Sequence, residues 1–393
     1  MSAAPWLANY PAGMPHSIDV DAYASLAEIF NESATQHPDR PAFTNEGTTL
    51  TYGDIDRFSA AFAAWLSARP DLSKGDRVAI MLPNLLQSPI AVLGVLRAGM
   101  VVVNVNPQYT PRELRHQLSD SGAKAILVLE NFAHTLAEIA AETDVSAIIV
   151  TSVGDQHPIP KRWIINFVIR HVRKMVKPAS LPDVVRWRNV LKQGASQPWK
   201  DIALTHDDVA CLQYTGGTTG IAKGAVLTHG NLVANVLQIA TWAQPVFDPD
   251  KGVVVTPLPI YHVFALTVGL FGFVKLGGHN LLITDPRDFD RFIATLRKQP
   301  FVFMIGVNTL FNALLQNPAF ASLDFSNLKC TLAGGMAIQR DVAERWQAVT
   351  GCAIAQGYGL TEASPVVSAN LLDTKQFNGS IGFPLPSTEV GIL

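Results

Sequence analysis

Residues 214–224 read Tyr-Thr-Gly-Gly-Thr-Thr-Gly-Ile-Ala-Lys-Gly and bring together residue types that bind phosphate. Glycine accepts positive φ angles and lets backbone N–H groups approach an anion closely. Successive N–H groups in such a turn form an anion-binding nest. The threonine hydroxyls add donors or metal ligands, and Lys223 adds a positive charge. Because a Walker A loop needs Ser or Thr after its lysine, and Gly224 stands there, we predict a phosphate-binding loop of another kind.

A second motif, residues 357–362, reads Gly-Tyr-Gly-Leu-Thr-Glu. Together with residues 214–224 it resembles the AMP-forming, acyl-activating enzymes, a family of acyl-CoA synthetases, luciferases and adenylation domains of peptide synthetases. Two signatures in the family's order and spacing are far more specific than either alone. The stretches at residues 100–107, 306–315 and 380–384 resemble one branch, the bacterial long-chain fatty-acid–CoA ligases of β-oxidation. The resemblance covers essentially the whole chain.

The resemblance implies a reaction in two halves. A fatty carboxylate attacks the α-phosphate of ATP, which gives an acyl-adenylate and pyrophosphate. The thiol of coenzyme A then attacks the acyl carbon and releases AMP. Because a carboxylate and a triphosphate repel each other, such a site needs cations and N–H donors around the phosphates. The implied reactants are therefore a long-chain fatty acid, ATP and coenzyme A, with Mg²⁺ as the metal ion.

The resemblance also assigns roles to single residues. Thr218 and Glu362 would hold Mg²⁺, a hard ion that suits hydroxyl and carboxylate oxygens. Thr361 would bond the α-phosphate, and Tyr358 would stack on adenine. His262 would lie beside the acyl carboxylate and the point where pantetheine enters. We do not expect His262 to be a general base, because a carboxylate is already ionised at neutral pH.

These roles define three sets of candidate residues. The catalytic set is Thr218, His262, Thr361 and Glu362. The nucleotide set is Tyr214, Thr215, Gly216, Gly217, Thr218, Thr219, Gly220, Lys223, Gly334, Gly335, Gly357, Tyr358, Gly359 and Thr361. The acyl set is His262, Val263, Phe264, Leu266, Gly306, Val307, Thr309 and Met336.

The acyl pocket should be apolar and deep. Burying each methylene group contributes about 0.8 kcal/mol, so a long tunnel selects long chains. Gly306 has no side chain, and we expect it to leave room for an alkyl chain to pass.

Family members continue beyond the position of Leu393, with a Thr-Gly-Asp motif and a small domain that carries the adenylation lysine. No Thr-Gly-Asp occurs in these 393 residues. We therefore expect a truncated chain that keeps the phosphate loop, the metal glutamate and the acyl pocket. We also expect it to be inactive or impaired when it acts alone.

Apolar runs alternate with helical patterns, and this alternation predicts how the motifs are positioned. Apolar strands, each separated from the next by a helix, are expected at residues 78–82, 101–103, 125–129 and 147–150. Such strands indicate a parallel sheet that is covered on both faces. A second unit is expected to begin with a strand at residues 209–214, followed by the phosphate loop and a helix from residue 229.

The predicted fold class is α/β, with residues 1–393 forming the N-terminal domain of such an enzyme. Two doubly wound subdomains are expected at about residues 50–195 and 205–350. The adenine and metal motif and an incomplete β-subdomain would follow at about 351–393. Because ligands bind at the carboxyl ends of parallel strands, we expect the candidate loops to gather at one sheet edge. These loops lie at residues 215, 261–262, 306, 334–335 and 358–362.

Bulk composition excludes several classes of protein. The net charge of −2 gives no reason to expect nucleic-acid binding. The three scattered cysteines fit a reducing compartment and neither a disulfide framework nor a zinc site. The N-terminus lacks the pattern of a signal peptide. One long run without a charged residue, 252–274, contains Pro257 and Pro259, so we predict a buried strand and turn there. A cytoplasmic protein is expected.

Residues 161–177 alternate basic and apolar side chains, and no acidic residue occurs between Asp155 and Asp183. The pattern predicts a basic amphipathic helix. Such a helix can lie on an anionic membrane, so peripheral contact with the inner membrane is one interpretation. A surface helix with a solvated basic face is the other.

Other functions share these signatures. One is an adenylating ligase for a short-chain or aryl acid, or one that transfers the acyl group to a carrier protein. An amino-acid activator would need an acidic partner for the ammonium group, and none stands in a pocket-like context at residues 253–336. A catalytically inactive protein that binds nucleotide or fatty acid is the third alternative.

Overall fold

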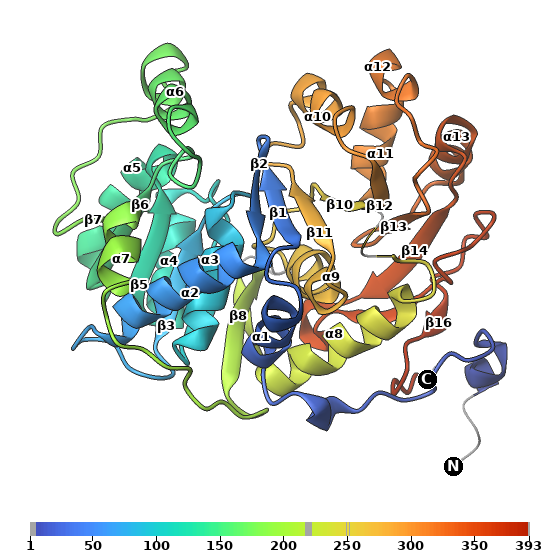
Figure 1. The fold of residues 1–393 in the computed structure, drawn as a ribbon, viewed down its shortest axis with the longest axis horizontal. Coiled ribbons are helices and arrows are strands. Elements are labelled where there is room, and N and C mark those ends of the chain that lie inside the picture. The colour runs from blue at the N-terminus through green and yellow to red at the C-terminus, as the bar shows by residue number, and fades with distance from the viewer. Residues whose placement is uncertain (1–4, 217–221, 249, 251, 392–393) are drawn as a thin grey trace. The chain divides into compact units, whose positions relative to one another are not determined.

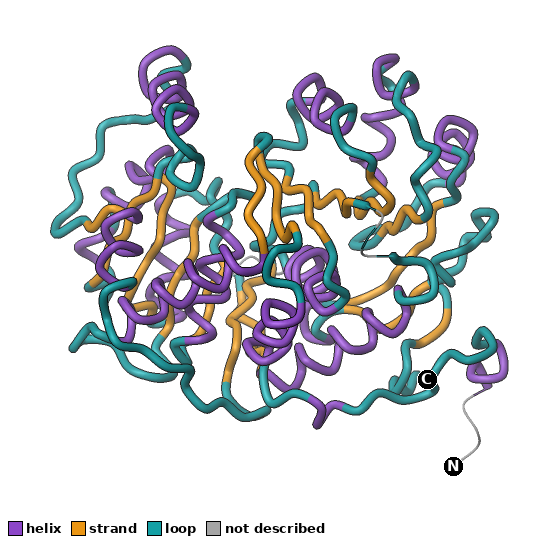
Figure 2. The backbone as a smooth tube through the Cα atoms, viewed as in Figure 1, coloured by secondary structure: helices purple, strands orange, loops and turns teal. Residues whose placement is uncertain are grey.

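The computed structural model describes residues 5–216, 222–248, 250 and 252–391. The chain divides into two compact units. The seven-strand unit comprises Ser25–Asp39 and Leu50–His229, and the nine-strand unit comprises Met1–Ala24, Arg40–Thr49 and Gly230–Leu393. In each unit helices surround a central sheet (Figures 1 and 2), which confirms the predicted α/β class.

The sheet of the seven-strand unit runs in the order β7-β6-β5-β3-β4-β8-β9. All neighbours are parallel except β8 and β9, which are antiparallel. The strands are β3 (Arg77–Met81), β4 (Val101–Asn104), β5 (Ala123–Leu129), β6 (Ala147–Thr151), β7 (Val185–Arg186), β8 (Val209–Thr215) and β9 (Lys223–Thr228). The helices are α1 (Leu26–Gln36), α2 (Tyr52–Ser67), α3 (Gln87–Arg97), α4 (Pro111–Ser121), α5 (Ala133–Ala137), α6 (Lys161–Phe167) and α7 (Trp187–Gly194).

This sheet is apolar on both faces. Ala79 and Met81 of β3 pack in a cluster with Leu114 of α4. Val78 and Ile80 alternate with them along the strand and are buried as well. Since successive side chains of a strand point to opposite faces, both faces must be covered by helices. The apolar runs of the sequence are therefore continuous because helices cover both faces of the sheet, as predicted.

The sheet of the nine-strand unit runs in the order β16-β15-β14-β13-β12-β10-β11-β1-β2. The strands from β1 to β14 in this order are parallel, whereas β15 and β16 pair antiparallel to their neighbours. The strands are β1 (Pro41–Asn45), β2 (Thr48–Thr51), β10 (Val253–Thr256), β11 (His279–Leu282), β12 (Phe301–Gly306), β13 (Cys330–Ala333), β14 (Ile354–Gly359), β15 (Val366–Ala369) and β16 (Phe383–Pro384). The helices are α8 (His229–Ala243), α9 (Phe273–Lys275), α10 (Phe289–Leu296), α11 (Asn308–Leu315), α12 (Pro318–Ala321) and α13 (Arg340–Thr350).

Two hydrophobic clusters cover the two faces of this sheet. Val253 and Val255 of β10 belong to one cluster with Trp346 of α13. Val254 belongs to the other cluster with Trp242 of α8. The strict alternation along β10 shows that this strand is central, so its polar neighbours can lie only beyond its ends.

The phosphate-loop region differs from the prediction. We expected it to open the second subdomain at about residue 205, but β8 pairs with β4 and belongs to the seven-strand unit. The strand β9, at Lys223–Thr228, was not predicted; it is an edge strand with few buried residues, so its apolar signal is weak. The candidate loops therefore follow strands of two sheets, and the expectation of a single sheet edge was wrong.

Two other expectations concern helices. The basic segment forms α6 followed by a π-helical turn at Val168–Val172, and helix ends before residue 173. Residues 252–274 form β10, a turn and a buried helical segment. Among the residues that the structure describes, no helix is both long enough and apolar enough to cross a membrane.

Stability should fall as the pH drops below about 6.5, and His229 should contribute to that loss. The residue is 1% exposed, and its Nδ1 accepts the backbone N–H of Leu26 at 3.2 Å. Burial lowers the pKa of His229 from 6.5 to about 4. Between pH 6.5 and pH 4 the imidazole is protonated in the unfolded chain but not in the folded chain. The free energy of unfolding therefore falls as the pH drops through this range. One such group costs about 2 kcal/mol between pH 7 and pH 5.

Urea unfolding at pH 7 and pH 5 measures this effect. The variant His229→Asn keeps an acceptor for Leu26 but cannot titrate, so its stability should change less between the two pH values. His16→Asn, at an exposed histidine, is the control. An unchanged difference in His229→Asn would contradict the assignment.

Candidate nucleotide and acyl site

The nine-strand unit brings four candidate loops to one edge of its sheet. The strands β10, β12, β13 and β14 are parallel neighbours, and each is followed by a candidate segment. A Cβ atom built on Gly334 would lie 3.0 Å from the ring of Phe264 and 3.5 Å from the carbonyl oxygen of Gly357. A Cβ atom built on Gly335 would lie 3.8 Å from Val307. Segments that are up to 93 positions apart in the sequence, 264 and 357, thus meet at these glycines.

The local backbone explains why glycine stands at two of the motif positions. Gly335 adopts φ +76°, a conformation that side chains with a Cβ atom disfavour. A Cβ atom on Gly359 would lie 2.2 Å from the carbonyl oxygen of Pro365, so the backbone approaches too closely for any other residue. Both positions therefore shape the loops on either side of Tyr358.

Tyr358 and Glu362 present their side chains to solvent. Tyr358 is 44% exposed at the end of β14, and Met336 is 50% exposed in the loop after β13. Glu362 is exposed within the short 3₁₀ turn Thr361–Ala363 and forms no ion pair with any described residue. An aromatic ring and a free carboxylate at a strand end are available for a ligand.

The described residues contain no group of three or more His, Cys, Asp or Glu side chains that could hold a metal ion. Glu362 offers one carboxylate, and its predicted partner Thr218 lies outside the described residues. This donor set suits a Mg²⁺ ion that takes most of its ligands from phosphate oxygens and water.

His262 begins the helical segment that follows β10. The backbone N–H of Phe264 donates to Nδ1 of His262 at 3.3 Å, and the N–H of Leu266 donates to the His262 carbonyl at 3.0 Å. An accepting Nδ1 carries no proton, so the neutral ring holds its proton on Nε2. Desolvation by the surrounding protein lowers the pKa of His262, although the residue is exposed at the surface. The imidazole is therefore a neutral hydrogen-bond donor.

The acyl set divides into exposed and interior residues. Thr309 and Met336 are exposed, and Phe264 and Val307 are half-buried. Val263 and Leu266, by contrast, are 1% and 2% exposed and belong to the protein interior.

Gly306 lies against an aromatic ring of its own unit. A Cβ atom on Gly306 would lie 2.5 Å from Cζ of Phe311, so the ring of Phe311 fills the space that a side chain at this position would need. The glycine is required by packing within the nine-strand unit.

The seven-strand unit holds the phosphate motif. Thr215 at the end of β8 pairs with Lys223 at the start of β9, and Lys223 is exposed. Gly216 is exposed and follows β8. Tyr214, however, is only 9% exposed and packs in the core. The other candidates of this loop lie outside the described residues: Gly217, Thr218, Thr219 and Gly220.

Sequence reasoning missed Gln356, which directly precedes the 357–362 motif. Its Oε1 accepts the N–H of Ile338 at 3.1 Å, and its Nε2 donates to the carbonyl of Ser380 at 3.0 Å. Gln356 is 5% exposed. It therefore ties the loop after β13 to the segment before β16. A polar residue directly after the apolar run at 353–355, next to a motif, was the available signal.

Solved structures share this fold. The anthranilate CoA ligase AuaEII superposes with a TM-score of 0.79 at 16% identity, covering 94% of this chain and 66% of that one. A long-chain-fatty-acid–CoA ligase from Archaeoglobus fulgidus gives a TM-score of 0.75 at 23% identity, covering 96% and 71%. The chain thus shares the fold of these two CoA ligases over most of its length.

The AMP-binding enzyme family matches residues 30–393, and the chain belongs to that family. It is 51% identical to a long-chain-fatty-acid–CoA ligase of Yersinia pestis, over 98% of this chain and 68% of the relative. The chain therefore spans about two thirds of the length of the relatives it matches.

Packing at Gly306 can be tested by substitution. Gly306→Ala should lower the free energy of unfolding by about 1–3 kcal/mol, because the methyl group overpacks the site against Phe311. The cost should shrink in the background of Phe311→Leu, since the ring is then gone. Urea unfolding of the single and double variants measures this coupling. Gly391→Ala, where a Cβ atom meets nothing within 4 Å, is the control. Equal costs in both backgrounds would contradict the packing role.

Proposed function

We propose that the chain carries the adenylating activity of a long-chain fatty-acid–CoA ligase. The observation that carries this proposal is the 51% identity to a ligase of that name over 98% of this chain. ATP and a long-chain fatty acid give an acyl-adenylate and pyrophosphate, and coenzyme A then displaces AMP. The acyl-CoA product would feed β-oxidation, and we place the reaction in the cytoplasm.

The nine-strand unit would bind the nucleoside and the acyl group. The exposed ring of Tyr358 would stack on adenine, with Gly334 and Gly335 allowing the backbone to approach the base. Thr361 would donate its hydroxyl to the α-phosphate. Glu362 would hold Mg²⁺ together with Thr218; the ion would supply positive charge for the phosphates when bound. Support for these roles comes from the exposure of Tyr358 and Glu362 beside the glycine loops.

The Nε2–H group of His262 would donate a hydrogen bond to an oxygen of the acyl carboxylate or adenylate. The capping bond from Phe264 supports this role, because it requires an unprotonated Nδ1 and leaves Nε2 as the donor. Phe264, Val307 and Met336 would contact the acyl chain. In the seven-strand unit, Thr215, Gly216 and Lys223 would bind the β- and γ-phosphates.

Glu362→Ala should weaken binding of Mg·ATP and cut adenylate formation, which we expect to be slow in this chain alone, by about 100-fold, the usual size of a lost electrostatic contact to the reacting phosphates. Calorimetric titration with Mg·ATP measures binding. Hydroxamate trapping with ATP, Mg²⁺ and palmitate measures adenylate. Glu344→Ala, which removes an exposed carboxylate of α13, is the matched control. The proposal fails if the parent chain does not bind Mg·ATP, and the role of Glu362 fails if its variant matches the control.

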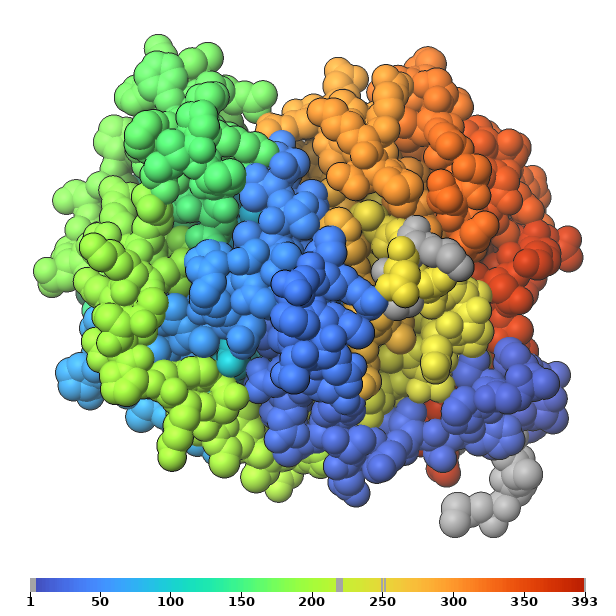
Figure 3. Space-filling model, in the orientation of Figure 1, coloured from blue at the N-terminus to red at the C-terminus, as the bar shows by residue number. Residues whose placement is uncertain are grey.

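We also propose that residues 159–177, the amphipathic segment, contact an anionic membrane surface. Six large apolar side chains there are 51–64% exposed: Ile159, Trp163, Ile164, Phe167, Val172 and Met175. Figure 1 shows α6 projecting beyond the sheet of its unit, and in Figure 3 the green surface of this part of the chain lies at the rim of that unit. Besides Arg170, five basic residues accompany the apolar ones: Lys161, Arg162, Arg173, Lys174 and Lys177.

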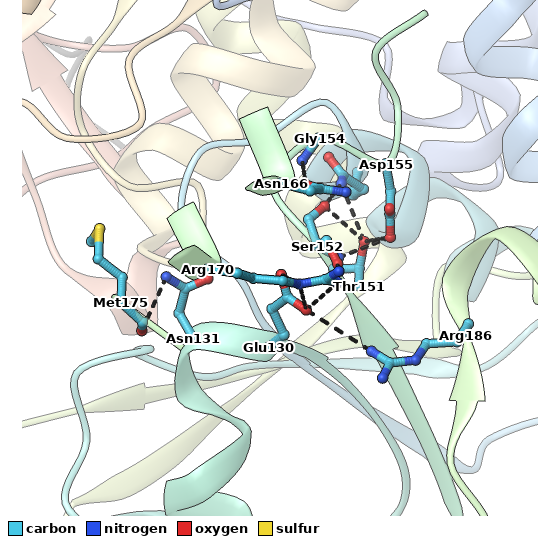
Figure 4. Close-up of polar contacts among 11 residues, drawn as sticks. Glu130, Asn131, Thr151, Ser152, Gly154, Asp155, Asn166, Arg170, Met175 and Arg186 are labelled. Carbon is cyan, nitrogen blue, oxygen red and sulfur yellow. Dashed lines mark hydrogen bonds and ion pairs between the residues drawn. The ribbon is translucent and has the colours of Figure 1, made fainter. Parts of the chain in front are cut away.

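The inner side of the amphipathic segment is held by polar contacts (Figure 4). Arg170 donates to the buried carboxylate of Glu130 at 2.6 Å and to Ser152 at 2.8 Å. Asn166 accepts the N–H of Gly154 at 2.8 Å. Because these bonds occupy the inner polar groups, the apolar side chains are left facing outward. An exposed apolar edge among basic residues suits a bilayer of anionic lipid.

Sedimentation with vesicles tests this contact. The chain should bind vesicles that contain phosphatidylglycerol more strongly than neutral vesicles, and added salt should weaken binding because the charges are screened. Trp163→Ala combined with Phe167→Ala should reduce binding by about 100-fold or more, since each buried aromatic contributes about 1.5–3 kcal/mol and 1.4 kcal/mol is tenfold. Val226→Ala, at an apolar residue of β9 that is 58% exposed, is the control. Equal binding by both variants would contradict the proposal.

A further inference from the structure

The helix α4 contacts the β8–β9 hairpin at both stems of the phosphate motif. Tyr214, the penultimate residue of β8, donates its hydroxyl to Oδ2 of Asp120 at 2.5 Å. On the other stem, Nε2 of His116 lies 2.9 Å from the carbonyl oxygen of Ala222, the residue that precedes β9. Since a carbonyl only accepts, the ring of His116 is the donor. One helix therefore holds the two chain segments from which the motif departs.

The ring of Tyr214 crosses the hairpin to reach α4. Tyr214 pairs with Gly224 across the hairpin, and a Cβ atom on Gly224 would lie 3.0 Å from the tyrosine ring. The ring packs in a cluster that also contains Leu114 and Leu118 of α4. Glycine is needed at position 224 because it makes room for the Tyr214 ring, which joins β8 to α4. Burial and the neighbouring Asp120 raise the pKa of Tyr214, so its hydroxyl keeps its proton at neutral pH.

The helix is itself firmly ended at both termini. Thr110 caps its N-terminus, and the side chain of Glu113 returns the bond to the Thr110 backbone at 2.8 Å. Pro111 occupies the first helical turn, and Gly122 ends the helix with φ 58°. These features lower the cost of forming α4 and hold its side chains at fixed positions. The helix can therefore serve as a rigid support for the hairpin.

We propose that Asp120 and His116 are positioning residues for phosphate binding. By holding Tyr214 and Ala222, they fix the backbone on which Thr215, Gly216 and Lys223 stand. Groups that are already ordered lose less entropy when a ligand binds, so the contacts raise affinity for the phosphates without touching them. This inference rests on the proposed function, because it assumes that these three residues bind the β- and γ-phosphates of ATP.

Comparing ATP with AMP separates this role from a general loss of stability, because AMP lacks the β- and γ-phosphates. In calorimetric titrations of the 393-residue chain, Tyr214→Phe and Asp120→Ala should each bind Mg·ATP about threefold to tenfold more weakly, the size of one lost hydrogen bond. Affinity for AMP should stay at the parent value. Asp120→Asn keeps an acceptor oxygen for the tyrosine hydroxyl and should recover most of the affinity for Mg·ATP.

The double variant Asp120→Ala with Tyr214→Phe should lose no more affinity than either single variant, because both remove the same bond. Ser119→Ala, at the exposed neighbour of Asp120 on α4, is the matched control and should bind like the parent. Far-UV circular dichroism checks that each variant is folded.

Each outcome decides a different point. A parent chain that binds no Mg·ATP overturns the proposed function and this inference with it. A parent chain that binds Mg·ATP, with Tyr214→Phe and Asp120→Ala equally tight, overturns the positioning role alone. Equal losses for ATP and AMP also overturn it, because they show that the hydrogen bond serves overall stability.

Discussion

The burial of both faces of the two sheets is the constraint on which the rest of this structure depends. In β10, alternate valines enter opposite hydrophobic clusters, so the strand has no face left for polar chemistry. Hydrogen-bonding groups that bind ligands must therefore lie beyond the strand ends. Four parallel strands of the nine-strand unit end at one edge, and the segments after them bring His262, Gly334, Tyr358 and Glu362 into one region of that unit.

Close packing at that edge explains why small residues recur there. Gly334 lies against Phe264, Gly359 against the backbone of Pro365, and Gly306 against the ring of Phe311. A methyl group would meet fixed backbone at Gly359 and the ring of the fully buried Phe311 at Gly306, whereas at Gly334 the ring of Phe264 would have to shift slightly. The same glycines that resemble a ligand-binding signature thus also satisfy packing within the fold. Buried amides such as Gln356 complete the arrangement, since they join loops that backbone bonds alone leave apart.

In the seven-strand unit, polar contacts hold two exposed elements in place: the β8–β9 hairpin and the amphipathic segment. The β8–β9 hairpin stands at the edge of the sheet, and α4 holds both of its stems. The amphipathic segment lies at the surface, and the Arg170–Glu130 pair holds its polar side. In both places a buried or half-buried polar bond sets the direction of an element whose other groups face outward. Such bonds are worth more than surface ion pairs, because breaking one leaves a buried polar group with fewer partners.

The sequence by itself determined the α/β class, the parallel strands and the two signature motifs. These are local properties: apolar runs between helical patterns, and glycines, hydroxyls and charges at short spacing. Only the tertiary structure decided which sheet each motif joins. The weak apolar pattern of β9 hid an edge strand, and the pairing of β8 with β4 depends on contacts more than a hundred residues apart in sequence, at 104 and 213. The structure likewise filled the space at Gly306 with Phe311 and placed Val263 and Leu266 in the interior. Burial and close contact depend on side chains that are far apart in the sequence, so no short stretch of sequence reveals them.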